Sequence, residues 1–427
     1  MRPGGRRLLG FSMRISCLAA VLAACLPLSA AADVRALPDY LTFQLQARST
    51  IGLGYNLPFN ASINSATVDL NDAGRVVVRV TLPTGIPGDD FTRHIFVGEN
   101  GGGFVVSEGP VGSLVSDPRV SPDGKVWFAA NFQGGNTQAG IYRYNPDDLS
   151  TVRVTGLPLG TTFFTSPRGN AAGQIGYRAD FATGKAWVSY SGSAAQTHAA
   201  EQTLDAGSPY SFLFTPSMDE RQLIAGKVTL VAGGFNQIRT IDNHGLAVVL
   251  ARTTAEDAQS PFSGFDNSPA IAPTSGQVAF IANLTAGGRG VYRYDGPGQI
   301  VEIARTGTQG LGSIESFGPA INDDGLVAFR GVDSNGKQAI FVGDDADLRR
   351  VIGRGDTINT DLGLGQIDQE TPASPAFSGG VAINAAGDIA FSPTLTPAGN
   401  NQIEWGTGVY IARAGSQELF ANGFEGN

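Results

Sequence analysis

The side chains that most often perform chemistry are scarce in this chain of 427 residues. The three histidines, His94, His198 and His244, are far apart, and no two have the spacing of ligands to one metal ion. A Gly-x-Ser-x-Gly elbow, a glycine-rich phosphate loop and a His-Glu-x-x-His motif are all absent from the sequence. The pattern argues against a histidine-based metal site and a Ser-His-Asp triad. It assigns no catalytic residue, and it leaves open catalysis by acids brought together from distant segments.

Acidic loops offer a second kind of chemistry, because oxygen ligands alternating over a tight turn can hold Ca²⁺. The candidate ligands are Asp344, Asp345 and Asp347, and similar loops occur at 333–336 and 145–148. None has the length and spacing of a full calcium loop. The alternative interpretation is an ordinary solvated turn. Calcium is the one cofactor that the sequence leaves open, and no other is expected.

Aromatic residues could form a platform on which sugar rings stack. Trp127, Trp187, Tyr142 and Tyr292, however, stand in apolar stretches that read as strands, which favours packing in the core. Trp405 precedes a strand in a polar segment, and we expect its ring to be exposed.

The N-terminus has the pattern of a targeting segment. Arginines precede an apolar run over 15–28, and Ala30-Ala31-Ala32 fits cleavage before Asp33. Residues 1–32 are therefore predicted to be a signal peptide, and the mature protein to be secreted or periplasmic. The alternative is a lipoprotein anchored through Cys25, whose preceding residues resemble a lipobox. Both cysteines, Cys17 and Cys25, lie in this leader, so we expect no disulfide in the mature chain.

Composition limits the partners. The predicted leader carries four arginines and no acid, so the mature chain has 25 basic and 38 acidic residues. A surface of that sign repels nucleic acid and anionic lipid. Charged residues make up 16% of the chain and there are 58 glycines, a balance that suits short strands and tight turns. No second apolar run is long enough for a membrane helix, so none is predicted in the mature chain.

A turn followed by an apolar strand recurs along the chain. In its clearest copy, Asn322 is predicted to fold its side chain onto a backbone N–H two residues on, and Gly325 to take a positive φ. Four apolar residues follow without a polar break, which predicts a strand covered on both faces. The turn residues of the seven copies are Asn71 and Gly74, Gly124, Asn170 and Gly173, Gly245, Gly276, Asn322 and Gly325, and Asn384 and Gly387.

Further strands surround each turn. A strand leads into it, and most copies are followed by a second strand with a small-apolar-aromatic signature and then by a third. This predicts four short strands per repeat. The copy around Gly245 (237–258) lacks a clear second strand and is the weakest. The Ser- and Ala-rich stretch around 192–216 is predicted to be an insertion or surface loop.

Four strands per unit of about fifty residues, repeated about seven times, indicate an all-β fold of the β-propeller type. We predict one domain over 33–427 with seven four-stranded blades, the alternatives being six blades or tandem β-sandwiches. Residues 40–45 are predicted to pair with the last unit and close the ring.

The turn-strand unit resembles the Asn-x-x-Gly-x-x-Ala-Phe repeat of a family of exported bacterial proteins whose function is undefined. Asn322, Gly325, Ala328 and Phe329 match in full, as do the equivalent residues from Asn384 to Phe391. The stretch 121–128, Ser-Pro-Asp-Gly-Lys-Val-Trp-Phe, is also similar to the repeat of TolB-like propellers. These resemblances imply a fold and a compartment.

Regular repetition without a catalytic cluster favours a non-catalytic propeller that binds a ligand or partner at one mouth of the ring. The expected partner is a carbohydrate or a cell-surface protein, and the chain is expected to be a monomer. The alternatives are a polysaccharide lyase or glycoside hydrolase with acids from separate blades, and a passive envelope or matrix component.

Overall fold

The computed structural model describes residues 36–63, 67–86, 89–106, 114–131, 138–154, 157–371 and 374–415. The described residues from Leu37 onward belong to one compact unit. The signal peptide predicted for 1–32 lies outside the described residues. Within the described ranges the regular elements are all β-strands. That part of the chain holds no helix long and apolar enough to cross a membrane.

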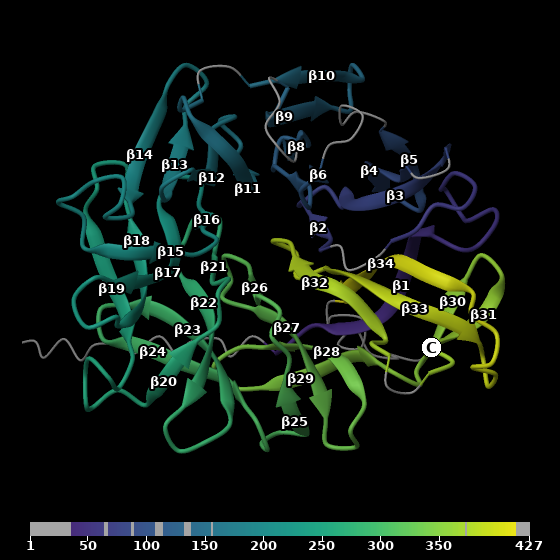
Figure 1. Ribbon diagram of the computed structural model, residues 1–427. Helices are drawn as coiled ribbons and strands as arrows, with labels where there is room; N and C mark the ends of the chain where they lie inside the picture. The colour runs from purple at the N-terminus through teal and green to yellow at the C-terminus, as the bar shows by residue number, and fades with distance from the viewer. Residues whose placement is uncertain are drawn as a thin grey trace, which may run out of the picture. The chain divides into compact units, whose positions relative to one another are not determined.

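In the described residues, seven antiparallel sheets follow one another around a ring (Figure 1). The first sheet contains β2 (Asp69–Leu70), β3 (Val76–Ile86), β4 (Asp89–Glu99) and β5 (Gly102–Val106). The second contains β6 (Leu114–Val115), β7 (Arg119–Val120), β8 (Val126–Asn131), β9 (Gly140–Asn145) and β10 (Ser150–Arg153). The third contains β11 (Thr161–Gly169), β12 (Ile175–Phe181), β13 (Lys185–Tyr190) and β14 (Ala195–Ala200).

The fourth sheet contains β15 (Tyr210–Leu213), β16 (Ser217–Met218), β17 (Ile224–Leu230), β18 (Asn236–Ile241) and β19 (Ala247–Arg252). The fifth contains β20 (Phe262–Phe265), β21 (Ala270–Ile271), β22 (Val278–Leu284), β23 (Arg289–Gly296) and β24 (Gln299–Arg305). The sixth contains β25 (Leu311–Ile314), β26 (Ala320–Ile321), β27 (Val327–Asp333), β28 (Gln338–Gly343) and β29 (Leu348–Gly353). In the fourth, fifth and sixth sheets, two short segments that pair with the same neighbouring strand together form the innermost strand. The labels β2, β11, β16, β21, β26 and β32 therefore gather around the middle of the ring in Figure 1.

The seventh sheet joins the two ends of the propeller. It contains β30 (Thr357–Thr360), β31 (Gly363–Ile367), β32 (Phe377–Ile383), β33 (Ile389–Pro397), β34 (Gly406–Gly415) and β1 (Asp39–Arg48). The strand β1 pairs with β34, with Phe43 opposite Ala412 and Leu45 opposite Tyr410. This confirms both the seven-bladed propeller and the predicted closing strand. The hairpin of β30 and β31 exceeds the predicted four strands.

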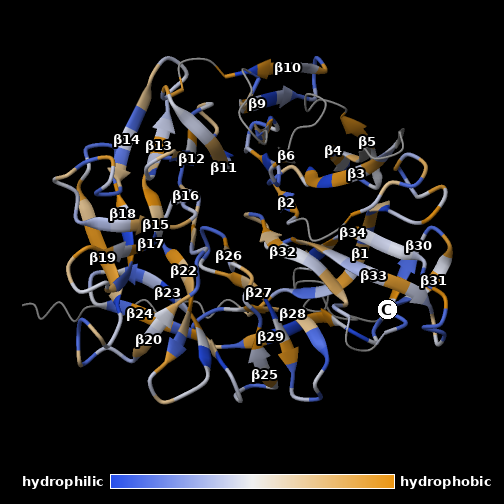
Figure 2. Ribbon diagram, viewed as in Figure 1, coloured by the Kyte–Doolittle hydropathy of each residue, from blue (hydrophilic) through white to orange (hydrophobic). Residues whose placement is uncertain are grey.

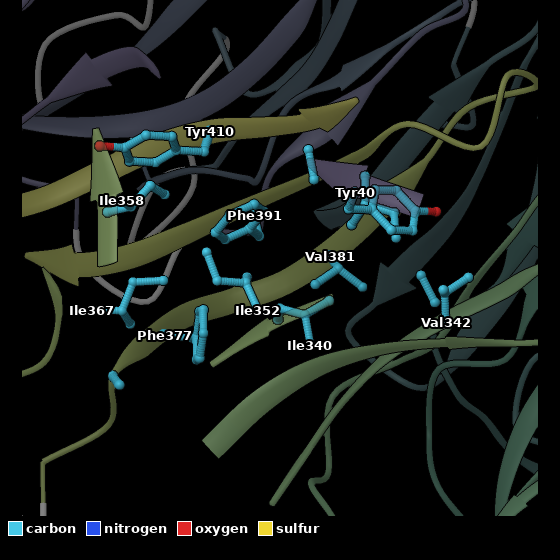
Figure 3. Packing of buried hydrophobic residues seen from close by; sticks show 14 of the residues in the cluster. Tyr40, Ile340, Val342, Ile352, Ile358, Ile367, Phe377, Val381, Phe391 and Tyr410 are labelled. Carbon is cyan, nitrogen blue, oxygen red and sulfur yellow. The ribbon is translucent and has the colours of Figure 1, made fainter. Parts of the chain in front are cut away.

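Neighbouring sheets cover one another's apolar faces, and this packing forms the core. Along β3, Val76 and Val78 pack against the seventh sheet, whereas Val77 packs against the second, because successive side chains of a strand point to opposite faces. The core between the sixth and seventh sheets contains Ile340 and Ile352 of the sixth sheet and Phe391 of the seventh (Figure 3). Apolar residues accordingly lie on strands all round the ring (Figure 2). The predicted double-sided burial is confirmed.

The small-apolar-aromatic signature has a packing origin. The aromatic residue four places after the turn glycine stacks on the aromatic residue of the next strand, as Phe280 does on Tyr292, with ring centroids 5.8 Å apart. A Cβ on Gly290 would come within 2.5 Å of the Tyr292 ring, so the small residue is required. The equivalent stacked pairs are Phe128 with Tyr142, Phe329 with Phe341, and Phe391 with Tyr410.

The repeat turn follows the prediction in its glycine but not in its side-chain bond. Gly325 has φ +81°, as expected. The Oδ1 atom of Asn322 accepts a hydrogen bond from the backbone N–H of Leu326 at 3.0 Å, four residues on instead of two. Asn71, Asn170 and Asn384 make the same bond. The side chain therefore ties the turn to the first residues of the strand that follows.

The fourth turn was misplaced by the sequence pattern. Gly245 lies between β18 and β19, at the outer edge of the fourth sheet. The true turn is Asp219 to Gln222, in which Gln222 takes φ +65° where the other copies place glycine. The Oδ1 atom of Asp219 accepts from the backbone N–H of Leu223 at 2.8 Å, in place of the asparagine. Gly245 is therefore not a repeat turn.

The stretch around 192–216 is not an insertion. Its residues form β14 and β15, which are the last strand of the third sheet and the first strand of the fourth. The Ser and Ala content masks the strand signal here because these residues have low β-propensity.

Substitution of Gly325 tests the turn. A Cβ at this position would lie 2.7 Å from Nη1 of Arg293, which reaches over from the preceding sheet. Gly325→Val should lower the free energy of unfolding by about 2 kcal/mol or more, because a positive φ alone costs a β-branched residue about 1–2 kcal/mol. Urea denaturation measures this. Gly298→Val is the matched control, with φ +74° and open space around it, and should lose less. An unchanged Gly325→Val protein would contradict this account of the turn.

Candidate functional site

A cavity of about 380 Å³ runs along the axis of the ring. Residues of the innermost strands of all seven sheets line it, together with the residues just before and just after those strands. No single sheet could form this site, since each contributes only a few side chains. The site therefore exists only when the ring is closed.

The middle layer of the cavity is a ring of seven equivalent residues. Each one pairs with the residue three places after the turn position of its own sheet, so all seven occupy the same place in the repeat. In order around the ring they are Asp69, Arg119, Arg168, Ser217, Ala270, Ala320 and Ala382. The first four are polar or charged and the last three are alanines. The cavity thus has one polar wall and one small, apolar wall.

The polar wall is held by contacts between neighbouring sheets. Nη1 of Arg119 lies 3.3 Å from Oδ1 of Asp69, and the other oxygen of Asp69 accepts from the backbone N–H of Val120 at 2.9 Å. Nη1 of Arg168 donates to Oγ of Ser217 at 3.1 Å. A β-bulge lies just before Arg168, between Thr165 and Arg168. Bulges commonly redirect a side chain near a functional site.

The layer toward one mouth carries hydroxyl and acidic groups. Its members stand two places before the middle ring and so share its face. Thr67 contacts both neighbours, because its backbone N–H donates to Asp117 at 3.3 Å and its hydroxyl accepts from the backbone N–H of Gly380 at 3.3 Å. Thr215 and Ser268 add two hydroxyls to the lining. This mouth is therefore polar.

Asparagine side chains hydrogen-bond neighbouring sheets together at the opposite mouth, where the repeat turns lie. Nδ2 of Asn322 donates to the carbonyl oxygen of Asn384 at 3.1 Å, and Nδ2 of Asn384 donates to that of Asn71 at 3.3 Å. Asn71 and Asn170 bond to Ser121 and Glu220 in the same way. The repeated asparagine therefore shapes its own turn with one atom and binds the next sheet with another.

Acidic side chains reinforce the same mouth. Oδ1 of Asp72 accepts from the backbone N–H of Ala385 at 2.8 Å, and Oε2 of Glu220 accepts from that of Ala171 at 2.8 Å. Burial raises the pKa of Glu220, and the hydrogen bond from Ala171 and the charge of Arg168 only partly oppose it. The other carboxylates of the described lining accept hydrogen bonds from backbone N–H groups; they are Asp69, Asp72, Asp117 and Asp323. Glycoside hydrolysis needs a second carboxyl group placed across the substrate, and the other carboxylates of the described lining are already held by these backbone donors.

Basic side chains link the sheets on the far side of the middle ring. A cation five places after the turn position reaches a backbone carbonyl of the next sheet in four blades. The four contacts are Arg79 to Val115, Arg178 to Leu213, Lys227 to Phe265 and Arg330 to Gly379. Burial lowers the pKa of both Lys227 and Arg330. These cations are part of the scaffold that positions the cavity wall.

The histidines do not contribute to this cavity. His94 on β4 lies 2.7 Å from the hydroxyl of Thr92, and His198 on β14 is buried 2.8 Å from that of Ser189. His244 lies in the turn between β18 and β19. None of the three lines the cavity.

The described residues contain no group of three or more His, Cys, Asp or Glu side chains that could hold a metal ion.

The calcium candidates lie in the turn between β28 and β29, away from the cavity. Oδ1 of Asp344 accepts from the backbone N–H groups of Ala346 at 2.8 Å and of Asp347 at 2.9 Å. The carboxylate thus already shapes the turn. Asp345 and Asp347 complete the acidic loop, and calcium binding there stays a prediction.

The aromatic residues pack as expected, with one exception. Trp127, Trp187, Tyr142 and Tyr292 are buried between blades. Trp405 was predicted to be exposed, which is wrong. Its ring is half-buried against the core of the seventh sheet, because the extra hairpin of β30 and β31 lies beside it.

Sequence reasoning missed the cavity residues because they share no chemistry. Asp69, Arg119, Arg168, Ala320 and Ala382 each stand five places before their turn glycine. Ser217 stands five places before Gln222, and Ala270 six before Gly276, whose turn is one residue longer. Aligning the seven turns and comparing the residues that stand five places before each turn position would have found them.

Comparison with known proteins supports the fold. Residues 235–380, less than half of the chain, match the model of a family of unknown function, DUF7453. No curated protein sequence matches the chain.

Solved structures similar to the chain are propellers with different activities. An oligogalacturonate lyase in complex with manganese aligns over 89% of this chain and 99% of its own, with 11% identity and a TM-score of 0.52. The β-propeller domain of the Trilobed protease from Pyrococcus furiosus aligns over 83% and 98%, with 14% identity and a TM-score of 0.50. TolB from Acinetobacter baumannii aligns over 66% of this chain and 63% of its own, less than two thirds, with 14% identity and a TM-score of 0.43. At these identities the likeness concerns the fold alone.

Substitution of Asn322 tests the bonds between sheets. Asn322→Ala removes both the bond within the turn and the bond to Asn384, and it leaves a buried carbonyl without its donor. We expect the free energy of unfolding to fall by about 1–3 kcal/mol, measured by urea denaturation. Asn335→Ala, at an exposed turn outside the ring of asparagines, is the control and should change it by less than about 0.5 kcal/mol. Equal effects of the two variants would refute a special role for the repeated asparagine.

Proposed function

We propose that this chain is an exported, non-catalytic β-propeller that binds a carbohydrate or a segment of a partner protein in its axial cavity. The observation that carries the proposal is the divided middle ring, in which a polar wall from four sheets faces an alanine wall from three. Seven equivalent positions that served packing alone would have no reason to differ in this way. Binding sites, in contrast, combine apolar surface with a few placed polar groups.

The size of the cavity agrees with this proposal. At about 380 Å³ it can hold a ligand of one or two sugar rings, or a few peptide residues, since ligand pockets span roughly 300–1,000 Å³. Alanines at 270, 320 and 382 leave this space open. Sugar rings and peptides both present an apolar face and hydrogen-bonding edges, which suits two unlike walls.

Catalysis is the second candidate, and Glu220 is the observation in its favour. A carboxyl group whose pKa is raised by burial can act as a general acid. Hydrolysis of a glycosidic bond would need a second carboxylate placed across the substrate. Because the other carboxylates of the described lining already accept hydrogen bonds from backbone N–H groups, binding is the better proposal.

A panel of glycans, polysaccharides and peptides, scored for both retention and cleavage, tests the two candidates together. We expect retention of one ligand class without cleavage. Ala320→Phe places a ring in the cavity and should weaken that retention at least tenfold. Ala286→Phe, at an exposed turn of the fifth sheet, is the matched control and should bind as the unsubstituted protein does. If Ala320→Phe retains the ligand as well as the unsubstituted protein does, the cavity is not the binding site. If the unsubstituted protein cleaves a ligand and Ala320→Phe does not, the enzyme is the better proposal.

A further inference from the structure

The two arginines of the middle ring differ in their partners. Arg119 forms an ion pair with Asp69. Arg168 occupies the same position in the next sheet, yet among the described side chains no carboxylate lies within ion-pair distance of it. Its guanidinium instead donates a hydrogen bond to the neutral hydroxyl of Ser217. The remaining N–H groups of its guanidinium therefore have no protein acceptor within the described residues.

Nearby acids do not fill this role, because each has closer donors. Asp69 is held by Arg119 and Val120, and Glu220 accepts from Ala171. Asp219 accepts from Arg221 and Leu223. These three carboxylates act on Arg168 only through longer-range charge interaction. A carboxylate in direct contact with Arg168 would therefore have to come from a ligand in the cavity.

Burial makes this arrangement costly without a ligand. Removal from water lowers the pKa of Arg168, and the like charge of Arg119 adds to that effect. A guanidinium nevertheless stays protonated in proteins. Arg168 is partly buried and its contact is to a neutral hydroxyl, so an anion in the cavity would stabilise its charge. If this position only stabilised the fold, an alanine, as in the fifth, sixth and seventh sheets, would avoid the cost of burying a charge.

The charge of the layer identifies the class of ligand. Asp69, Arg119 and Arg168 are its charged members, so the middle ring carries a net charge of plus one. The rest of the lining is acidic, so the positive charge is confined to this ring. Each of the further acids accepts a hydrogen bond from a backbone N–H; they are Asp72, Asp117, Glu220 and Asp323. One carboxylate neutralises it and matches the planar fork of a guanidinium. A phosphate dianion would need Arg119 as well, which is already paired.

We propose that the axial cavity binds a ligand bearing a carboxylate, which accepts hydrogen bonds from Arg168 while the rest of the ligand lies against Ala270, Ala320 and Ala382. This inference rests on the proposed function and assigns the chemical class of its ligand. The ligand enters as an anion, and no covalent step is involved.

Calorimetric titration with paired probes tests the charge requirement on the unsubstituted protein. The pairs are glucuronate with glucose, and acetate with acetamide, which differ chiefly in the charged group. We expect at least one acid to bind at least tenfold more tightly than its neutral counterpart, and its affinity to fall as NaCl is raised. Neutral probes that bind as tightly as the acids, or acids that do not bind, would overturn the inference.

Variants of Arg168 locate the effect. Arg168→Gln should reduce binding of the acid probe at least tenfold, and Arg168→Lys should retain part of it, because lysine keeps the charge without the fork. Arg153→Gln removes the same charge from an exposed strand at the outer edge of the second sheet, and should bind normally. The melting temperature of Arg168→Gln should be unchanged or raised; a marked fall would assign Arg168 to the scaffold and contradict the inference.

The outcomes separate this inference from the proposed function. If Ala320→Phe abolishes retention of a neutral ligand and Arg168→Gln does not, the cavity binds but the carboxylate assignment is wrong. If Ala320→Phe changes nothing, the cavity itself is not the binding site, and both fail.

Discussion

Mutual coverage of neighbouring sheets is the constraint on which this structure depends. The middle strands carry apolar residues on both faces, so one face of each packs on the sheet before and the other on the sheet after. Seven cores lie at the boundaries between the seven sheets of the described chain. A linear stack would leave the outer apolar faces of its first and last sheets in water. Each Å² of apolar surface left exposed costs about 25 cal/mol of free energy. A closed ring leaves none.

Hydrogen bonds set the geometry of that packing at both mouths. On one side asparagine and acidic side chains join successive turns, and on the other arginine and lysine reach successive carbonyls. Apolar packing is tolerant of small rotations, whereas hydrogen bonds are directional. Together they hold the innermost strands in one arrangement. The cavity wall can then vary on its alanine side, because Ala270, Ala320 and Ala382 make no side-chain hydrogen bond to a neighbouring sheet.

The parts of this fold that follow from local chemistry could be predicted. A glycine at positive φ, a strand without a polar residue and an apolar strand at the beginning of the repeats are visible one segment at a time, and they led to the ring and its closure. The fourth turn was lost because Gln222 adopts the glycine conformation, a choice that depends on surrounding structure and not on its own preference. Trp405 was misjudged because the hairpin beside it belongs to no repeat.

The site could not be predicted from any one segment. Arg168, Ser217 and Ala320 come from three sheets and share no motif, and their proximity arises from closure of the ring. What relates them is their distance from the turn, which becomes meaningful only after the turns have been aligned correctly. With Gly245 taken for the fourth turn, that column would have read Thr240 instead of Ser217.

The position of the closing strand bears on the order in which the protein can fold. The hydroxyl of Tyr40 donates to the carbonyl oxygen of Gly387, 347 residues away, and the last sheet needs β1 to be complete. Joining ends so distant costs about 5 kcal/mol of chain entropy in a flexible-loop estimate. Contacts of this range also make folding slow. A ribosome must release nearly the whole polypeptide before the first strand can find its partner, so the last sheet is completed only when synthesis is almost over.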